Sequence, residues 1–161
     1  MRILPLFLLT VLLCSLVHAA SREPFEGLVT GDRVRLRAGP GLSYEVLHTV
    51  RKRERVQVTA EQGSWYGVRL PPGAPLYVHR SFLQQEGEWA RVQGNRVQIR
   101  AGAGEGFTSV GSLSAPQSVR VRGILGEWVQ IDPPLDSVLG WISKAYVVPL
   151  KVPSQSSQEG S

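Results

Sequence analysis

Two stretches of the chain repeat the same alternation of apolar and polar residues, and each ends on paired glycines. In the stretch 33–41 (RVRLRAGPG) Val34 and Leu36 alternate with arginines, and 63 residues later the stretch 96–104 (RVQIRAGAG) follows the same pattern. An alternation of period two predicts a strand that buries one face, and the glycines predict a turn because glycine tolerates positive φ. Each stretch is therefore expected to be a half-buried strand that enters a tight turn.

The repeat covers most of the chain. At an offset of 63, twelve residues of the first copy meet an identical residue in the second, from Val29 to Trp65. After the proline-containing stretch 71–75 the offset becomes 64, so that 76–83 lies over 140–147. We interpret this pattern as a tandem duplication in which the repeat is the unit of structure.

Short apolar runs separated by Gly and Pro predict an all-β fold, since no segment holds the period of 3.6 residues that a helix requires. The strands expected in the first copy are 33–37, 46–50, 55–60, 65–70 and 76–79. Those expected in the second copy are 96–100, 109–113, 119–122, 128–131 and 140–142. Five short strands per copy favour a small barrel or sandwich.

The repeats also set the predicted domain boundaries. These are a first domain at 25–84, a linker at 85–90, a second domain at 91–148 and a polar, disordered tail at 149–161. Trp89 interrupts the polarity of the linker and corresponds to Phe25 ahead of the first copy. Two interpretations are open: Trp89 wedges between the domains, or it begins a strand as a core residue.

Residues 1–19 have the pattern of a secretory signal peptide. Arg2 precedes an apolar run over residues 3–17, and small residues around Ala19 fit a signal-peptidase site. An uncleaved membrane anchor is the alternative, but the run is shorter than the roughly 20 apolar residues that a span needs. We therefore expect cleavage after Ala19 and a periplasmic or extracellular protein. Cys14, the only cysteine, lies in the signal, so the mature chain has no disulfide and no thiolate.

Three motifs of the first copy resemble those of the bacterial SH3-like (SH3b) domain. They are the R-x-G-x-G turn at 37–41, the G-x-W segment at 63–65 and the closing aromatic Phe82, and the second copy is similar, with Tyr146 near its end. The resemblance implies two tandem small SH3-like β-barrels of about five short strands each. It also implies a binding function, since such modules recognise cell-wall peptides, glycans or other proteins.

The residues give no support to a catalytic function. After the signal only His48 and His79 remain, and their spacing fits no zinc motif. The carboxylates are scattered, and nothing in their spacing indicates a catalytic pair. We expect no enzyme, no catalytic residue, no metal and no cofactor.

Four aromatic residues fall on the polar side of their predicted strands: Trp65 and Tyr77 in the first copy, and Trp128 and Trp141 in the second. Exposed rings with polar tips suit the recognition of peptides or sugars. Strands of a small barrel can also bend enough to bury both faces, and tryptophan is highly buried on average. Groove lining and plain core packing are both open for these rings.

The predicted ligand site contains these four rings and four further residues. Those are Tyr44 and Phe107, which follow the glycine turns, and Arg37 and Arg100, which could donate to a carboxylate or a peptide carbonyl. In this hypothesis Trp65 neighbours Tyr77, and Trp128 neighbours Trp141.

Basic residues are the other candidate for recognition. Residues 28–84 hold nine Lys and Arg against four Asp and Glu, whereas residues 91–148 hold six against four. Arg33, Arg35 and Arg37 share the polar side of one strand. Such a surface would attract anionic polymers of the cell envelope, and an ordinary solvated face is the alternative explanation.

The sequence thus predicts a non-catalytic exported protein whose tandem SH3b-like domains bind a cell-envelope ligand: a wall peptide, a glycan or a protein. The alternative is a structural or interaction protein whose repeats pack on each other or scaffold an envelope complex. Neither nucleic acid nor a stable membrane span is expected.

Overall fold

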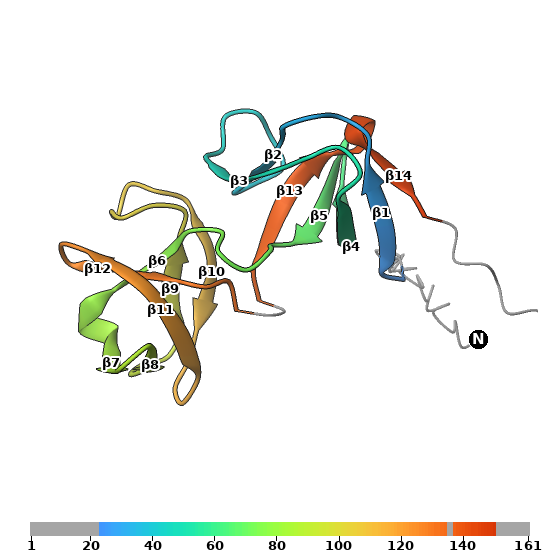
Figure 1. Cartoon of the computed structure of the whole chain (residues 1–161). Coiled ribbons are helices and arrows are strands. Elements are labelled where there is room, and N and C mark those ends of the chain that lie inside the picture. Colours follow the sequence, from blue (N-terminus) through green and yellow to red (C-terminus); the bar gives the residue numbers. More distant parts are fainter. Residues whose placement is uncertain (1–22, 135–136, 151–161) are drawn as a thin grey trace, which may run out of the picture.

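The computed structural model describes residues 23–134 and 137–150. These residues form two antiparallel sheets of seven strands each, and apart from two short 3₁₀ turns they contain no helix (Figure 1). The all-β fold expected from the period-two pattern is therefore confirmed. The predicted signal peptide lies outside the described residues.

The first half of the chain contributes seven strands and one 3₁₀ turn. These are β1 (Phe25–Val29), β2 (Val34–Arg37), β3 (Val46–Val50), β4 (Arg55–Gln62), β5 (Trp65–Arg69), β6 (Leu76–His79), η1 (Arg80–Phe82) and β7 (Leu83–Glu86). The second half has a corresponding series. Its elements are β8 (Trp89–Val92), β9 (Val97–Arg100), β10 (Ser109–Leu113), β11 (Ser118–Leu125), β12 (Trp128–Ile131), β13 (Leu139–Ser143), η2 (Lys144–Tyr146) and β14 (Val147–Pro149).

The two copies exchange their last strands. The first sheet has the order β14-β1-β4-β5-β13-β2-β3, and the second has the order β7-β8-β11-β12-β6-β9-β10. The strands β1–β5 of the first copy are thus completed by β13 and β14 of the second, while β8–β12 are completed by β6 and β7 of the first. The expectation that each copy supplies every strand of its own domain, five in number, is therefore corrected.

Each exchanged strand takes the same place in its sheet. Ser143 of β13 pairs with Trp65 of β5 in the first sheet, and His79 of β6 pairs with Trp128 of β12 in the second. Because His79 and Ser143 are equivalent residues at the offset of 64, backbone pairing alone does not favour the exchange. The side chains must decide which strand completes which sheet.

The side chains around Gly140 of β13 explain the exchange. A Cβ on Gly140 would lie 2.6 Å from Cδ2 of Leu70 and 3.2 Å from Cβ of Leu36, so the first sheet has no room for a larger side chain there. The equivalent residue of β6 is Leu76, which is fully buried in the second sheet, where Pro133 occupies the position equivalent to Leu70. Closing β6 onto its own copy would overpack the core at Leu70, which typically costs about 1–3 kcal/mol.

Two crossovers carry the chain between the sheets: residues 70–75, and a second one of which the structure describes residues 132–134 and 137–138 (Figure 1). Each contains two consecutive prolines, which cannot donate a hydrogen bond to a strand ladder, so β5 and β12 end there. In the first crossover Gly73 has a positive φ of 87°, and its N–H donates to Oδ1 of Asp132 in the second crossover over 3.1 Å. The two crossovers therefore contact each other directly.

The predicted linker at 85–90 belongs to a hairpin of the second sheet. Its strands β7 and β8 pair around Gly87, which has a positive φ of 63°. The predicted tail at 149–161 also begins too early, because Pro149 lies in β14 opposite Gly27 of β1. The remainder of the tail, beyond residue 150, lies outside the described residues.

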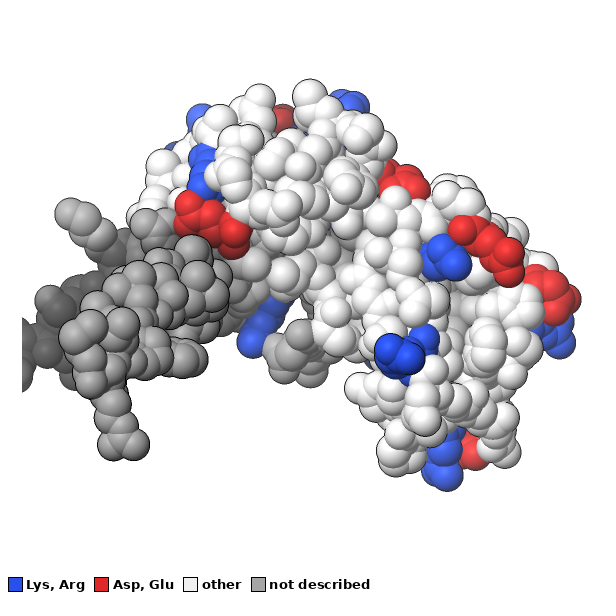
Figure 2. Space-filling model, turned by 180° about the vertical axis from the view of Figure 1, so that it is seen from behind, with Lys and Arg blue, Asp and Glu red and all other residues white. Residues whose placement is uncertain are grey.

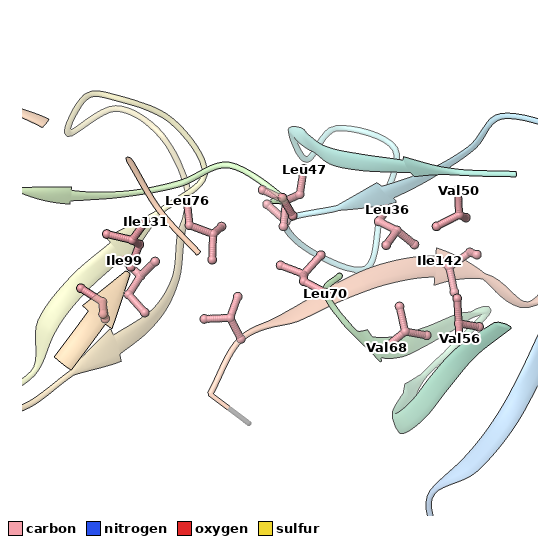
Figure 3. Packing of buried hydrophobic residues seen from close by; sticks show 14 of the residues in the cluster. Leu36, Leu47, Val50, Val56, Val68, Leu70, Leu76, Ile99, Ile131 and Ile142 are labelled. Atoms are coloured by element: carbon pink, nitrogen blue, oxygen red, sulfur yellow. The ribbon is translucent and has the colours of Figure 1, made fainter. Parts of the chain in front are cut away.

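Buried aliphatic side chains form one core cluster that extends over both sheets. Figure 3 shows Ile99, Ile131 and Leu76 in the second sheet and a further row of buried side chains in the first. Ala74 and Val138, one in each crossover, are only 0% and 3% exposed, so the crossovers belong to the core. The two sheets are therefore expected to stabilise each other.

Trp89 begins β8, as one interpretation expected, but its side chain is 53% exposed. In the register of the strands Trp89 takes the place of Glu26 in the first sheet, because Trp89 pairs with Arg120 where Glu26 pairs with Gln57, so the expected correspondence with Phe25 is wrong by one residue. Glu26 is exposed as well, whereas Phe25 packs edge to face on Tyr66 with ring centroids 5.5 Å apart. Both interpretations placed Trp89 in a buried contact, and both are wrong on that point.

Asp132 is expected to make the stability of the fold sensitive to acid. Its pKa is lowered, first by the hydrogen bond from Nε of Arg122 (2.7 Å) and further by the N–H of Gly73. An unfolded Asp has a pKa of about 3.9, so the folded carboxylate stabilises the protein above that pH and loses this contribution as the pH falls through its lower folded value. Asp132→Asn should remove this part of the acid dependence.

Urea unfolding at pH 7 and at pH 3 measures the effect. We expect the midpoint of the unaltered protein to fall more between the two pH values than that of Asp132→Asn. The control is Asp32→Asn, since Asp32 is exposed and its side chain forms no hydrogen bond or ion pair with the described residues. An Asp132 variant with the full acid dependence of the unaltered protein would contradict the prediction.

Candidate functional site

A groove of about 380 Å³ lies beside β2 and β5 of the first sheet. This first groove is lined by residues 31–35, Arg37, Leu42, Trp65, Ser143 and Tyr146. Basic, aromatic and aliphatic side chains thus share its walls. Such a mixture suits a ligand that has both polar groups and apolar surface.

An equivalent groove of about 420 Å³ lies beside β9 and β12 of the second sheet. This second groove is lined by residues 94–98, Arg100, Glu105, Trp128, His79, Ser81 and Phe82. Most of these positions match those of the first groove at the offset of 63 or 64. The structure therefore builds the same kind of site twice.

Each groove needs both copies of the repeat. Ser143 and Tyr146 in the wall of the first groove come from the second copy, and the Tyr146 carbonyl accepts a hydrogen bond from the N–H of Thr30 (3.0 Å). A Cβ on Gly31 would lie 2.9 Å from the ring of Tyr146, so a glycine is required where the exchanged aromatic closes the groove. In the second groove the carbonyl of Phe82 accepts an equivalent hydrogen bond from the N–H of Gln93 (2.8 Å).

Four of the eight predicted site residues line the grooves. Trp65 and Arg37 lie in the first groove, and Trp128 and Arg100 lie in the second. Both tryptophans are half-buried, which agrees with the groove-lining interpretation of their position on the polar side of the strands. His79 packs edge to face on Trp128, with ring centroids 5.3 Å apart.

Trp141 and Tyr77 are also half-buried, but they line neither groove. Trp141 pairs with Arg37 in the first sheet, and Tyr77 pairs with Arg100 in the second. The expected neighbours Trp65–Tyr77 and Trp128–Trp141 therefore lie in different sheets. That part of the prediction is wrong because it assumed that each copy closes on its own last strand.

Tyr44 and Phe107 pack on the glycine turns and line neither groove. A Cβ on Gly39 would lie 2.5 Å from the Tyr44 ring, and a Cβ on Gly102 would lie 2.4 Å from the Phe107 ring. Each ring is partly exposed, at 38% and 42%, but its inner face covers the turn. The expectation that these rings form the lip of a ligand groove is therefore not supported by the geometry.

Arg37 and Arg100 hold the same turns from the groove side. Nη1 of Arg37 donates to the carbonyl of Tyr44 (2.8 Å), and Nη1 of Arg100 donates to the carbonyl of Phe107 (2.9 Å). Each guanidinium carries five N–H donors, so further donors stay available to a ligand. The two arginines are therefore structural and remain candidates for binding.

Arg33 and Arg35 add free cations to the first groove. Both are exposed, and neither side chain forms a hydrogen bond or ion pair with the described residues. Arg33 and its counterpart Arg96 adopt positive φ angles of 53° and 52°, a region that residues other than glycine rarely occupy. Arg53 has a positive φ of 72° as well and lines neither groove, so among the described residues this backbone conformation is shared by the two grooves but is not confined to them.

The charge elsewhere on the surface is dispersed. Figure 2 shows the face opposite to that of Figure 1, where basic and acidic side chains are scattered and no broad patch has a single sign. Several cations are engaged in ion pairs, such as Arg120 with Glu88 (3.2 Å) and Arg80 with Glu127 (3.6 Å). On that face the basic charge of the chain therefore forms no continuous surface for an anionic polymer.

Glu45 connects the two copies next to the glycine turns. Its Oε1 accepts a hydrogen bond from the N–H of Thr108 (2.9 Å), which is its own equivalent 63 residues later. This hydrogen bond is the main cause of a lowered pKa of Glu45. Because equivalent residues touch, the two glycine turns approach each other at this point.

The part of the chain that the structure describes contains no group of three or more His, Cys, Asp or Glu side chains placed to hold a metal ion. Within the same residues no helix is long and apolar enough to cross a membrane.

Sequence reasoning missed several groove residues. Tyr146 and Phe82 were noted only as closing aromatics, because their contribution to the groove of the other copy depends on the exchange. Leu42 and Glu105 lie in the glycine turns, whose fold cannot be read from a period-two pattern. A signal in the sequence was the equivalent pair Gly31 and Gly94, which lie just ahead of β2 and β9.

The chain is similar to one curated protein named as the putative N-acetylmuramoyl-L-alanine amidase YrvJ of Bacillus subtilis (strain 168). The two are 25% identical over 132 residues, which cover 76% of this chain and 25% of YrvJ. The chain therefore spans about a quarter of the length of this relative. No solved structure matches the chain.

A protein-family model described as "Bacterial SH3 domain" matches residues 32–84. The match begins just ahead of β2 and ends in β7, so it includes the last strands that the structure places in the second sheet. This part of the chain, with its R-x-G-x-G turn and the Trp65 of the first groove, is thus similar in sequence to the bacterial SH3 domain.

Proposed function

We propose that this chain is a non-catalytic exported protein whose two SH3b-like units bind a peptide or glycan of the cell wall. The observation that carries the proposal is the pair of equivalent grooves, each with a half-buried tryptophan and an arginine. Tryptophan and arginine are the residues most enriched at binding hot spots. In the second groove Oγ of Ser81 lies 2.8 Å from Nδ1 of His79, but this nitrogen also accepts a hydrogen bond from the N–H of Ser81 as the cap of η1, and no described side chain hydrogen-bonds the imidazole from its other nitrogen.

The comparisons support a wall ligand. The family model matches the segment that provides most of the first groove, and YrvJ is named as an amidase of N-acetylmuramoyl-L-alanine. We extend the SH3b assignment to the second copy because its strands have the same order and its groove the same lining positions. The proposal includes cleavage of the predicted signal after Ala19.

The test is sedimentation of the purified chain from Ala20 onward with insoluble peptidoglycan. We expect the protein to enter the pellet with peptidoglycan and to stay in the supernatant with cellulose, which controls for unspecific adsorption to a polysaccharide. Retention should fall when soluble wall fragments are added as competitor. A protein that remains in solution at every peptidoglycan concentration would overturn the proposed function.

The alternative function, a structural or interaction protein, is favoured by a different observation: the copies share one core through the exchanged strands. Such a protein would bind envelope proteins. Sedimentation of envelope protein with the immobilised chain, together with no binding to peptidoglycan, would support this alternative.

A further inference from the structure

The two grooves differ in charge at three equivalent positions. The first groove has Arg35 where the second has Gln98, and it has Leu42 where the second has Glu105. It also has Asp32 at the position of Asn95 in the second groove. The first groove therefore holds three arginines and one acid, whereas the second holds two arginines and one acid.

The two grooves differ more clearly in the number of arginines that lack a protein partner than in the total number of charged residues. Arg37 and Arg100 are each engaged with a backbone carbonyl of their own turn. Two guanidinium groups of the first groove, those of Arg33 and Arg35, and one of the second, that of Arg96, form no hydrogen bond or ion pair with the described residues. In addition, the acid of the second groove lies in the glycine turn, where the first groove has an aliphatic side chain.

We propose that the first groove binds a peptide through two carboxylates, which pair with Arg33 and Arg35, and that the second groove lacks this selectivity. The inference rests on the proposed binding function and adds the chemistry by which one groove selects its ligand. Arg33 and Arg35 determine the specificity of the first groove for two carboxylates. The second groove lacks this specificity because Gln98 stands at the position equivalent to Arg35.

The position of the two arginines favours a peptide. Arg35 lies in β2 and Arg33 directly precedes that strand in a left-handed conformation, and both side chains line the first groove, where two carboxylates of one peptide can reach them. Guanidinium groups pair with carboxylates through two parallel hydrogen bonds. Trp65, Tyr146 and Leu42 provide the apolar surface against which the carbon atoms of a peptide can pack.

The probe is an acetylated and amidated pentapeptide Ala-Glu-Ala-Glu-Ala, compared with the neutral peptide Ala-Gln-Ala-Gln-Ala. The indole N–H resonances of Trp65 and Trp128 in NMR spectra report separately on the two grooves. We expect the glutamate peptide to shift the Trp65 resonance with at least tenfold higher affinity than the glutamine peptide. We expect the Trp128 resonance to show no such preference, and added salt should reduce the difference at Trp65.

Substitutions that swap the residues at the equivalent positions 35 and 98 provide matched variants. Arg35→Gln should weaken binding of the glutamate peptide to the first groove about fivefold, equivalent to about 1 kcal/mol. Gln98→Arg should give the second groove a preference for the same peptide. The control is Arg51→Gln, which removes one exposed arginine outside both grooves and should change neither resonance titration.

Several outcomes would overturn the inference. They are equal affinity for the two peptides, the same preference in both grooves, absence of any shift at Trp65, or an unchanged affinity in Arg35→Gln. Tighter binding of a glycerol phosphate oligomer than of the glutamate peptide would assign the arginines to phosphate instead of carboxylate. If these results occur while the protein still sediments with peptidoglycan, the proposed function stands and only this inference fails.

Discussion

Replacing Ile142 by alanine is expected to lower the free energy of unfolding by about 2–5 kcal/mol and to loosen the first sheet most. Ile142 lies in the second copy of the sequence, yet it is fully buried and pairs with Tyr66 of β5 in the first sheet. Truncation leaves a cavity among side chains of the first copy, such as Val68 and Leu36 (Figure 3). Urea unfolding measures the loss, and hydrogen exchange locates it.

Hydrogen exchange distinguishes the exchanged topology from closure of each copy on itself. If the two copies exchange their last strands, the amides of β5 and β2 in Ile142→Ala should lose more protection than those of β12 and β9. The control is Ile124→Ala, in the same copy, because Ile124 is 61% exposed and should cost less than about 0.5 kcal/mol. A greater loss of protection in β12 than in β5 would contradict the exchange of the last strands between the copies.

Replacing Trp65 by alanine is expected to weaken binding to wall fragments by about 2 kcal/mol, roughly thirtyfold. Trp65 is half-buried in the wall of the first groove and forms no ring stacking with the described aromatic residues. The effect on stability should be smaller than that of Ile142→Ala, because part of the indole is already in contact with water. Titration calorimetry with soluble wall fragments and urea unfolding measure the two effects on the same variant.

Trp89→Ala is the matched control, since it removes the same side chain from a 53% exposed position outside both grooves. We expect it to leave binding unchanged. Trp128→Ala should weaken binding at the second groove and also cost some stability, because Trp128 packs on the ring of His79. If Trp65→Ala loses several kcal/mol of stability and binding is lost only by unfolding, the ring is a packing residue and the groove hypothesis is wrong.

The sequence by itself determined the elements and their faces. Alternation in β2 and β9 placed Val34, Leu36 and Ile99 in the core, whereas for Trp65 and Trp128, on the polar side of their strands, it left groove lining and core packing open. These features follow from local chemistry, because a strand that is covered on one side must bury every second residue. The repeat extended each assignment from one copy to the other.

Parts of the fold and site that depend on long-range contacts were not predictable in this way. β1, β7 and β14 are short strands with weak alternation, and they form because an edge of the sheet is available to pair with them. Trp89 lies on the surface because the pairing of β8 with β11 places it where the exposed Glu26 lies in the first sheet.

Only the tertiary structure decided which last strand completes which sheet. Strands β6 and β13 have the same alternation and the same register with their neighbours, so no local pattern distinguishes the two pairings. The choice comes from side-chain volume: Leu70 fills the space beside Gly140, and Leu76 needs a sheet without that leucine. This choice brings Tyr146 and Phe82 into the grooves, because packing between distant segments selects the partner where backbone pairing permits both.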